Sequence, residues 1–416
     1  MSKPFRKPEL LSPAGDPEKL TAAVVYGADA VYLAGTSFGM RAGTGNFTCP
    51  ELEAAARYAH SRNVRVYVTC NTVPTDPDLV ALPAFLEQVD SFGADGLIVT
   101  DLGVFSLCRK YAPHTEIHIS TQAGVMNSEA ANAFYDLGAK RIVLAREMSV
   151  EAIRELRSRV PDDLEIEAFC HGAMCVSFSG RCMLSEYLTG RDPNRGMCAQ
   201  PCRWKYHLMA EQKPGEFFEI SEENGTFILN SRDMCMIDHV SDLISAGVSS
   251  LKIEGRTKSA YYVASSTAAY RHALDCAAAG TPLPEIWRDE VNKLSHRPYC
   301  TGFYYGQPGQ SSDDSSYLSL YDVVAMVESC DASGNAHLTQ RNGFRPGDTL
   351  ELLRPDGDPV SFSAGEIFDA EGRPVKITRH PKMDLFMKLP VQAPKYSFLR
   401  KPRTENTPGR KAGRTV

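Results

Sequence analysis

Short apolar runs alternate with segments of helical periodicity from residue 9 to about residue 255. The runs predict buried strands, and the segments between them, with apolar residues three or four positions apart, predict helices. Repeated strand-helix units are typical of parallel strands, and about eight of them predict a closed (β/α)8 TIM-like barrel. A doubly wound open sheet is the alternative. The predicted strands are Glu9–Ser12, Ala30–Leu33, Val64–Thr69, Gly96–Thr100, Glu116–Ser120, Arg141–Ala145, Leu164–Phe169 and Ser250–Ile253.

The pattern changes after this region. From Leu320 to Leu399 short alternating runs are broken by Asp-Gly and Pro-Gly turns, which predicts a small β-barrel domain. One of these predicted strands is Pro374–Thr378. The final segment has no apolar period and is rich in Lys and Arg, so we expect it to be disordered. The predicted organisation is a barrel at 1–290 with an insertion at about 170–249, a linker at 291–319, the β domain at 320–400 and a basic tail at 401–416.

A barrel predicts where chemistry takes place, because active sites of such enzymes lie at the carboxyl ends of the strands. The residues just past the predicted strands are almost all polar or glycine. They include Thr121-Gln122, Arg146-Glu147 and Glu254-Gly255-Arg256. The insertion follows the seventh strand directly, which places it over the barrel mouth.

The insertion begins with an unusual concentration of thiols. Five of the twelve cysteines lie between Glu167 and Trp204, at intervals of C-x6-C, C-x15-C and C-x3-C. Disulfides are not expected, because the N-terminus does not resemble a signal peptide and a cytosolic chain is kept reduced. Zinc sites usually show paired short C-x-x-C motifs, whereas an iron-sulfur cluster takes thiolates from separate loops. The spacing alone leaves a cluster, zinc and buried thiols open.

Longer motifs carry a family resemblance. The run E-A-F-C-H-G-A-M-C-V-S-F-S-G-R-C-M-L-S and its continuation L-T-G-R-D-P-N-R-G-M-C-A-Q-P-C-R-W resemble the collagenase-like peptidase family of unknown catalytic type, in the branch that hydroxylates RNA. Further motifs extend from E-L-L-S-P-A-G at Glu9 to R-N-G-F-R-P-G-D at Arg341. The likeness implies an oxygen-independent hydroxylase that uses prephenate to convert the wobble uridine of tRNA to 5-hydroxyuridine. Related branches act on ribosomal RNA or on quinone precursors.

The resemblance also implies metal ligands, and the chemistry and placement of other residues add further site candidates. It suggests a 4Fe–4S cluster held by Cys175, Cys182, Cys198 and Cys235, with Cys202 as a possible substitute for one ligand. His171 is a candidate for proton transfer, although a hydrogen bond to a backbone carbonyl at the strand end is the favoured alternative. Glu254 and Arg256 are the other catalytic candidates. Guanidinium and ammonium groups suited to a dicarboxylate or to phosphate are those of Arg146, Arg181, Arg203 and Lys258.

Composition excludes little. The formal net charge of -6 neither favours nor rules out RNA binding, since phosphate contacts depend on local Lys and Arg. No apolar run approaches the roughly 20 residues of a membrane span, so we expect a cytoplasmic protein.

A peptidase is disfavoured because H-E-x-x-H is absent and G-T-S-F-G at Gly35 lacks recognisable partners. A scaffold with structural zinc would need the cysteines but no polar barrel mouth.

Overall fold

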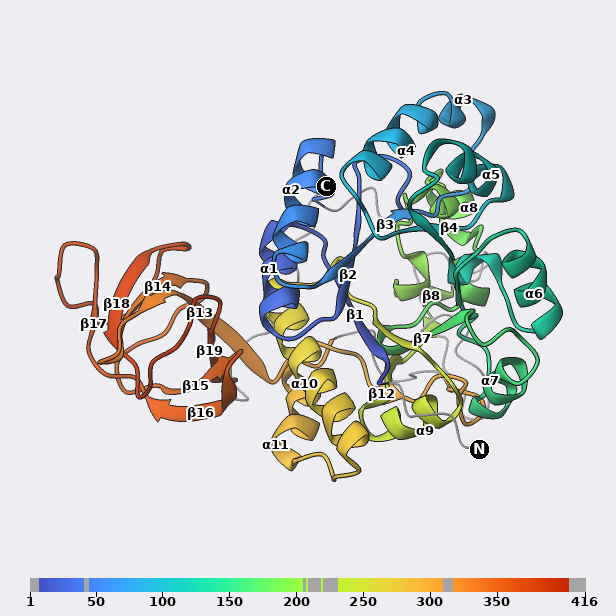
Figure 1. The fold of residues 1–416 in the computed structure, drawn as a ribbon. Helices are drawn as coiled ribbons and strands as arrows, with labels where there is room; N and C mark the ends of the chain where they lie inside the picture. Colours follow the sequence, from blue (N-terminus) through green and yellow to red (C-terminus); the bar gives the residue numbers. More distant parts are fainter. Residues whose placement is uncertain are drawn as a thin grey trace. The chain divides into compact units, whose positions relative to one another are not determined.

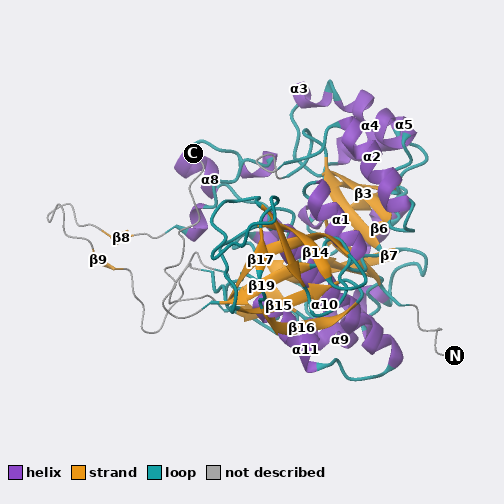
Figure 2. Ribbon diagram, turned by 90° about the vertical axis from the view of Figure 1, so that its left-hand side faces the viewer, coloured by secondary structure: helices purple, strands orange, loops and turns teal. Residues whose placement is uncertain are grey.

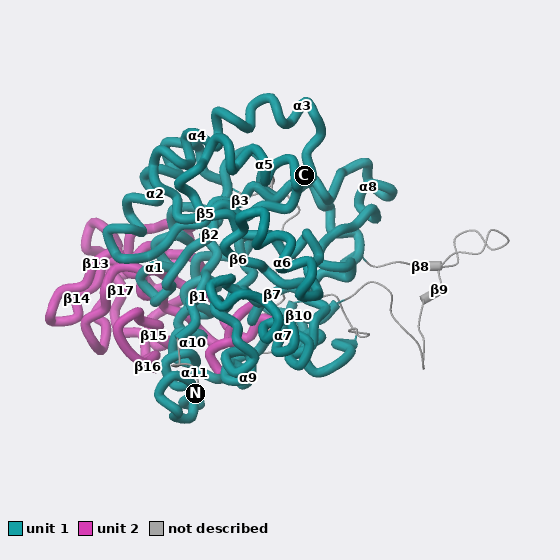
Figure 3. Tube along the Cα trace, turned by 45° about the vertical axis from the view of Figure 1, so that its right-hand side comes forward, with its two compact units in different colours: residues 1–288, 296–317 teal, residues 289–295, 318–416 magenta. Residues whose placement is uncertain are grey.

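The computed structural model describes residues 7–40, 45–204, 207–208, 218–219, 231–309 and 317–403. The chain divides into two compact units (Figure 3). Unit 1 comprises residues 1–288 and 296–317, and unit 2 comprises residues 289–295 and 318–416. The predicted disordered tail falls mostly on residues 404–416, which lie outside the described residues.

Unit 1 contains the predicted closed barrel (Figure 1). Eight parallel strands run in the order β11-β1-β2-β3-β4-β5-β6-β7, and β11 pairs with both β1 and β7, which closes the ring. The prediction of a TIM-like barrel is confirmed, and the alternative of an open sheet is wrong. The strands are β1 Glu9–Pro13, β2 Ala30–Ala34, β3 Arg65–Cys70, β4 Gly96–Val99, β5 Glu116–Ile119, β6 Arg141–Val143, β7 Glu165–Ala173 and β11 Ser250–Ile253.

The helices form an outer layer around these strands (Figures 1 and 2). In the part of the chain that the structure describes, five of them begin at a side chain that accepts a hydrogen bond from the first turn, as Asp16 does from the backbone N–H of Lys19 at 2.9 Å. In the described residues no helix is both long and apolar enough to span a membrane. The helices are α1 Pro17–Val25, α2 Cys49–His60, α3 Asp76–Leu79, α4 Leu82–Ser91, α5 Leu102–Tyr111, α6 Ser128–Asp136, α7 Val150–Arg157, α8 Leu184–Thr189, α9 Val240–Ser245, α10 Ala260–Ala279 and α11 Glu285–Arg288.

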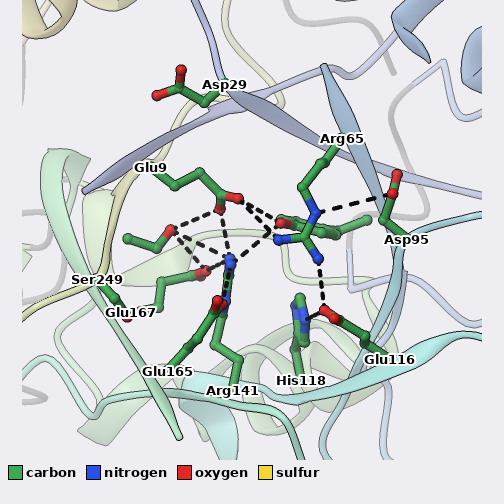
Figure 4. Close-up of polar contacts among 12 residues, drawn as sticks. Glu9, Asp29, Arg65, Asp95, Glu116, His118, Arg141, Glu165, Glu167 and Ser249 are labelled. Atoms are coloured by element: carbon green, nitrogen blue, oxygen red, sulfur yellow. Dashed lines mark hydrogen bonds and ion pairs between the residues drawn. The ribbon is translucent and has the colours of Figure 1, made fainter. Parts of the chain in front are cut away.

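Ion pairs fill the amino end of the barrel (Figure 4). Arg141, only 1% exposed, donates from Nη1 to Glu9 Oε1 at 2.7 Å and to Glu167 Oε2 at 2.9 Å, and it also pairs with Glu165. Because buried charges need partners, this network explains how charged residues can stand inside the barrel. It lies at the starts of the strands, away from the end where barrel enzymes place their chemistry.

The seventh strand is longer than the sequence predicts. β7 continues to Ala173 because its end pairs antiparallel with β10 Asp233–Cys235, which returns from the insertion. β10 also pairs with β12 Tyr299–Cys300. The insertion further contains the 3₁₀ turns η2 Phe178–Gly180, η3 Pro193–Arg195 and η4 Pro201–Arg203, and the short strands β8 His207–Leu208 and β9 Phe218–Glu219.

Unit 2 is a separate antiparallel sheet in the order β16-β15-β19-β13-β14-β18-β17, with β16 and β17 at its ends. Pro374–Thr378 was predicted as a strand and is not one, since only an isolated bridge joins Pro374 to Phe368. β19 runs to Pro402 because it pairs with Tyr321 there. The strands are β13 Tyr321–Cys330, β14 Asn335–Gln340, β15 Thr349–Arg354, β16 Gly357–Ser363, β17 Ile367–Phe368, β18 Asp384–Lys388 and β19 Phe398–Pro402.

Candidate active site at the barrel mouth

A cavity of about 200 Å³ lies at the carboxyl ends of the barrel strands. Its lining includes Tyr32 on β2, Thr69 on β3, Phe169 on β7 and Lys252 on β11, together with residues of the insertion. Alternate side chains of a barrel strand face inward, so these positions are where the strand pattern directs side chains into the mouth. The cavity is therefore where a barrel enzyme would place its active site.

Positive charge predominates in the lining. Five basic side chains line the cavity, and Glu254 is the one carboxylate among the lining residues that the structure describes. A group of cations in a partly enclosed site attracts anions. The five are Arg146, Arg203, Lys252, Arg256 and Lys258.

The deepest of these cations are fixed by their neighbours. Lys252 Nζ lies 2.8 Å from Glu167 Oε1 and 4.7 Å from the centre of the Tyr32 ring. Arg256 is 3% exposed, and its Nη1 donates to Thr69 Oγ1 at 2.9 Å. Both groups are thus preorganised for a ligand, because little side-chain freedom remains to be lost on binding.

Two further cations share an aromatic partner. Arg203 Nη1 donates to the Tyr317 hydroxyl at 3.0 Å, and Lys258 Nζ lies 4.2 Å from the centre of the Tyr317 ring. Burial lowers the pKa of Lys258 to about 8, against the opposing effect of the Asp233 carboxylate. The charge of Lys258 therefore changes just above neutral pH.

Four thiols line the same cavity, those of Cys175, Cys182, Cys198 and Cys202. The backbone N–H of Leu184 donates to Cys182 Sγ at 3.3 Å, and that of Gln200 donates to Cys198 Sγ at 3.4 Å. Hydrogen bonds to sulfur are among the interactions that tune iron-sulfur clusters, so the thiols and their N–H donors suit such a group in chemistry. Within the described ranges, no three His, Cys, Asp or Glu side chains are close enough to hold a metal ion.

Cys235 is placed differently from the other three implied ligands. It is not in the cavity lining; its register partner on β7 is His171, and the Tyr270 hydroxyl of α10 lies 3.8 Å from its Sγ. Burial raises the pKa of this thiol to about 11. Cys175, Cys182, Cys198 and Cys202 thus line one cavity, Cys235 lies outside it, and the ligand set stays a prediction.

His171 does not line the cavity either. Its ring is 1% exposed and lies beside Tyr262, Tyr270 and Tyr299, with ring centroids 5.9, 5.3 and 5.5 Å away. Burial lowers the pKa of His171 to about 3, so the imidazole is neutral at physiological pH. This position gives no support to proton transfer in the cavity. Arg181 is exposed and also lies outside the lining.

Lys252 and Gln122 are lining residues for which the sequence predicted no role; Gln122 stood out only as a polar residue past the fifth strand. The sequence feature that could have identified Lys252 is its position two residues before Glu254, because alternate side chains of a barrel strand face inward. Nothing in the sequence separated Gln122 from the other polar loop residues.

The protein is thus a TIM-like barrel with a candidate active-site cavity, lined by cations and thiols, at the carboxyl ends of its strands. Comparison with known proteins identifies the family. The chain belongs to peptidase family U32, whose model matches residues 15–314, and the family's C-terminal domain matches residues 319–400.

Three relatives are named for the modification of RNA. The chain is 36% identical over 403 residues to tRNA hydroxylation protein P1 of Bacillus subtilis, covering 95% of each chain. It is 36% identical over 415 residues to tRNA hydroxylation protein P of Escherichia coli, covering 89% of this chain and 91% of that one. It is 38% identical over 267 residues to the 23S rRNA 5-hydroxycytidine C2501 synthase of Escherichia coli, covering 64% of this chain and 39% of that one.

Proposed function

We propose that this protein is a tRNA hydroxylase. The observation that carries the proposal is its similarity, at 36% identity and across 95% of both chains, to a tRNA hydroxylation protein. The cation-rich barrel mouth supports it, because RNA phosphate and acidic small molecules both need such groups. The 23S rRNA relative covers less of this chain, which favours tRNA over ribosomal RNA.

The finer proposal is prephenate-dependent hydroxylation of the wobble uridine at C5. Prephenate carries two carboxylates, and Lys252 and Arg256 line one cavity. Guanidinium groups match carboxylates through paired charge-assisted hydrogen bonds. These side chains would bind and orient the acid, while the buried walls formed by Tyr32 and Phe169 exclude water from it.

The proposed cofactor is a 4Fe–4S cluster. Cys175, Cys182 and Cys198 would hold it, with Cys235 or Cys202 as the fourth ligand. When bound, such a cluster supplies one-electron redox chemistry. The protein would contribute thiolates, and the N–H groups of Leu184 and Gln200 donate to the sulfur atoms of Cys182 and Cys198.

Deleting the gene and measuring tRNA nucleosides by mass spectrometry tests the function. We expect loss of 5-hydroxyuridine-derived nucleosides and their return when the wild-type gene is restored. The 23S ribosomal RNA of the same strain should keep its modification pattern. Unchanged tRNA together with a lost ribosomal 5-hydroxycytidine would instead assign the protein to ribosomal RNA.

A further inference from the structure

One polar side chain in the cavity is buried and lacks a partner. Gln122 is 6% exposed and lines the cavity, and within the described part of the chain its Oε1 has no hydrogen-bond partner. Most buried polar groups in proteins are hydrogen-bonded, and leaving one unsatisfied costs about 1–3 kcal/mol. An acceptor kept at that cost beside a cavity suits a ligand that donates to it.

The backbone of Gln122 is held firmly. It lies in the 3₁₀ turn η1, Thr121–Ala123, whose cap Ser120 accepts from the Gln122 N–H. Thr121 Oγ1 donates to Leu144 O at 2.8 Å, and Gly124 ends the turn with φ of 72°. The amide is therefore presented from a rigid support at the end of β5.

The neighbouring wall offers a donor. Arg146 lines the same cavity, and its Nε is buried without a partner among the described residues. Its Nη1 donates to Ala173 O at 3.0 Å, and its guanidinium lies 4.1 Å from the centre of the Phe169 ring. These contacts fix the plane of the group.

A strained residue closes this side of the cavity. Ser179 lies in the same lining with φ of 46°, a conformation that is unfavourable for a non-glycine residue. Glu147 stabilises it by accepting from the Ser179 N–H at 2.7 Å and from its hydroxyl at 2.6 Å. Such strain is found at sites where surrounding structure imposes a particular geometry.

Gln122 and Arg256 occupy different sides of the mouth. Gln122 follows β5, whereas Arg256 follows β11 and reaches Thr69 on β3. In the closed order of strands, β5 is separated from β11 by β6 and β7 on one side and from β3 by β4 on the other. One side thus presents the buried guanidinium of Arg256, and the other presents an amide oxygen and an arginine Nε that have no partner among the described residues.

We propose that Gln122 and Arg146 read the Watson–Crick edge of a uracil base in the target RNA; this inference rests on the proposed function. Uracil presents N3–H to the Gln122 amide oxygen and its O4 to Arg146 Nε. Enzymes that act on a base within RNA or DNA read it through such edge contacts after it leaves the stack. Cytosine presents an acceptor at N3 and an amino group at position 4. The Gln122 amide can rotate to suit that base, but a guanidinium cannot accept a hydrogen bond.

Binding of two RNA hairpins tests the assignment. They have the sequence of a tRNA anticodon arm and differ only in carrying uridine or cytidine at the target position. We expect the wild type to bind the uridine hairpin about tenfold more tightly, the discrimination typical of a paired base contact. Gln122→Leu should lose most of this ratio, and Gln122→Glu, which keeps an acceptor, should retain it. Gln88→Leu, at an exposed glutamine of α4, is the matched control.

The inference is overturned if Gln122→Leu keeps the wild-type ratio of affinities for the uridine and cytidine hairpins while its thermal unfolding midpoint matches that of the wild type. Equal binding of both hairpins by the wild type would overturn it as well. Neither result bears on whether the protein hydroxylates tRNA, which the nucleoside measurement in the deletion strain decides.

Discussion

The ammonium of Lys252 lies 2.8 Å from a carboxylate oxygen of Glu167, and the two residues are 5% and 0% exposed. Glu167 also accepts from Arg141 at the amino end of the barrel (Figure 4). One buried carboxylate therefore connects the cavity with the ion network beneath it. The cation on the cavity floor is held in place by the same contacts that stabilise the barrel.

Glu167→Gln should destabilise the protein by about 3–5 kcal/mol, because it removes the carboxylate that pairs with the buried Lys252 and one of the three carboxylates around Arg141. Urea unfolding measures the effect. Glu155→Gln is the control, since Glu155 pairs with Arg159 at an exposed helix position and such pairs contribute about 0–1 kcal/mol. Equal destabilisation by the two variants would contradict a structural role for the buried pair.

Acid should lower the free energy of unfolding, and the loss should be smaller in Glu167→Gln than in the wild type. Burial by itself raises the pKa of Glu167, but Lys252 and Arg141 outweigh it and hold that pKa at about 2. Because the folded-state pKa lies below the ordinary value of 4.5, the stabilisation is complete above about pH 4.5 and is lost as pH falls towards 2. Urea unfolding of both proteins between about pH 2 and about pH 4.5 measures how the free energy of unfolding depends on pH. A variant as acid-sensitive as the wild type would show that other carboxylates dominate.

Anaerobically purified protein should be brown, with roughly four irons per chain, and Cys182→Ala or Cys198→Ala should lose the iron. Both thiols line the cavity and receive a backbone N–H. Cys202→Ala and Cys235→Ala then identify the fourth ligand by which of them loses iron. Cys276→Ala, on α10, should keep it. A colourless, iron-free anaerobic preparation with full activity would reject the cluster.

Arg256→Ala should keep iron and tRNA binding but lose prephenate-dependent hydroxylation. A bidentate, charge-assisted contact contributes about 1.5–3 kcal/mol, or roughly ten- to a hundredfold in prephenate affinity. Arg203→Ala is the comparison, since Arg203 lies on the insertion and should instead weaken tRNA binding with a shallower salt dependence. Prephenate titration and tRNA binding at several salt concentrations separate the two. If Arg256→Ala titrates prephenate like the wild type, Arg256 is structural.

Periodicity was sufficient to predict the barrel, because each buried parallel strand reads as an apolar run. It failed where pairing between distant segments decides the structure. The extension of β7 to Ala173 depends on β10, which returns sixty residues later, as their pairing of Ala173 with Asp233 shows. The isolated bridge at Pro374 is the opposite case, a β-like run that finds too few partners.

The site was predicted less completely than the fold. The strand-end rule located Arg256 and Arg146 correctly in the lining, because it depends only on strand positions. His171, another predicted candidate, instead has its ring beside Tyr270 of α10, 5.3 Å between centroids. The significance of Gln122 depends on the absence of a hydrogen-bond partner among the described residues, which only coordinates reveal.

Binding of tRNA should weaken as pH rises through about 8 if Lys258 contacts phosphate. Its pKa is lowered to about 8 chiefly by burial, with the guanidinium groups of Arg203 and Arg297 adding to the effect and Asp233 opposing it. A lysine is charged below its pKa, so the ammonium is present at about pH 7 and mostly lost at about pH 9, which should reduce affinity by roughly tenfold.

The variant Lys258→Arg isolates this effect, because a guanidinium keeps its charge throughout that range. We expect its affinity for tRNA to stay flat between about pH 7 and about pH 9, while Lys110→Arg, at an exposed lysine of α5, should follow the wild type. Affinities measured at constant ionic strength are needed, since salt alone changes phosphate contacts. An identical decline in Lys258→Arg and the wild type would assign the pH dependence to another group and leave Lys258 as a packing residue over Tyr317.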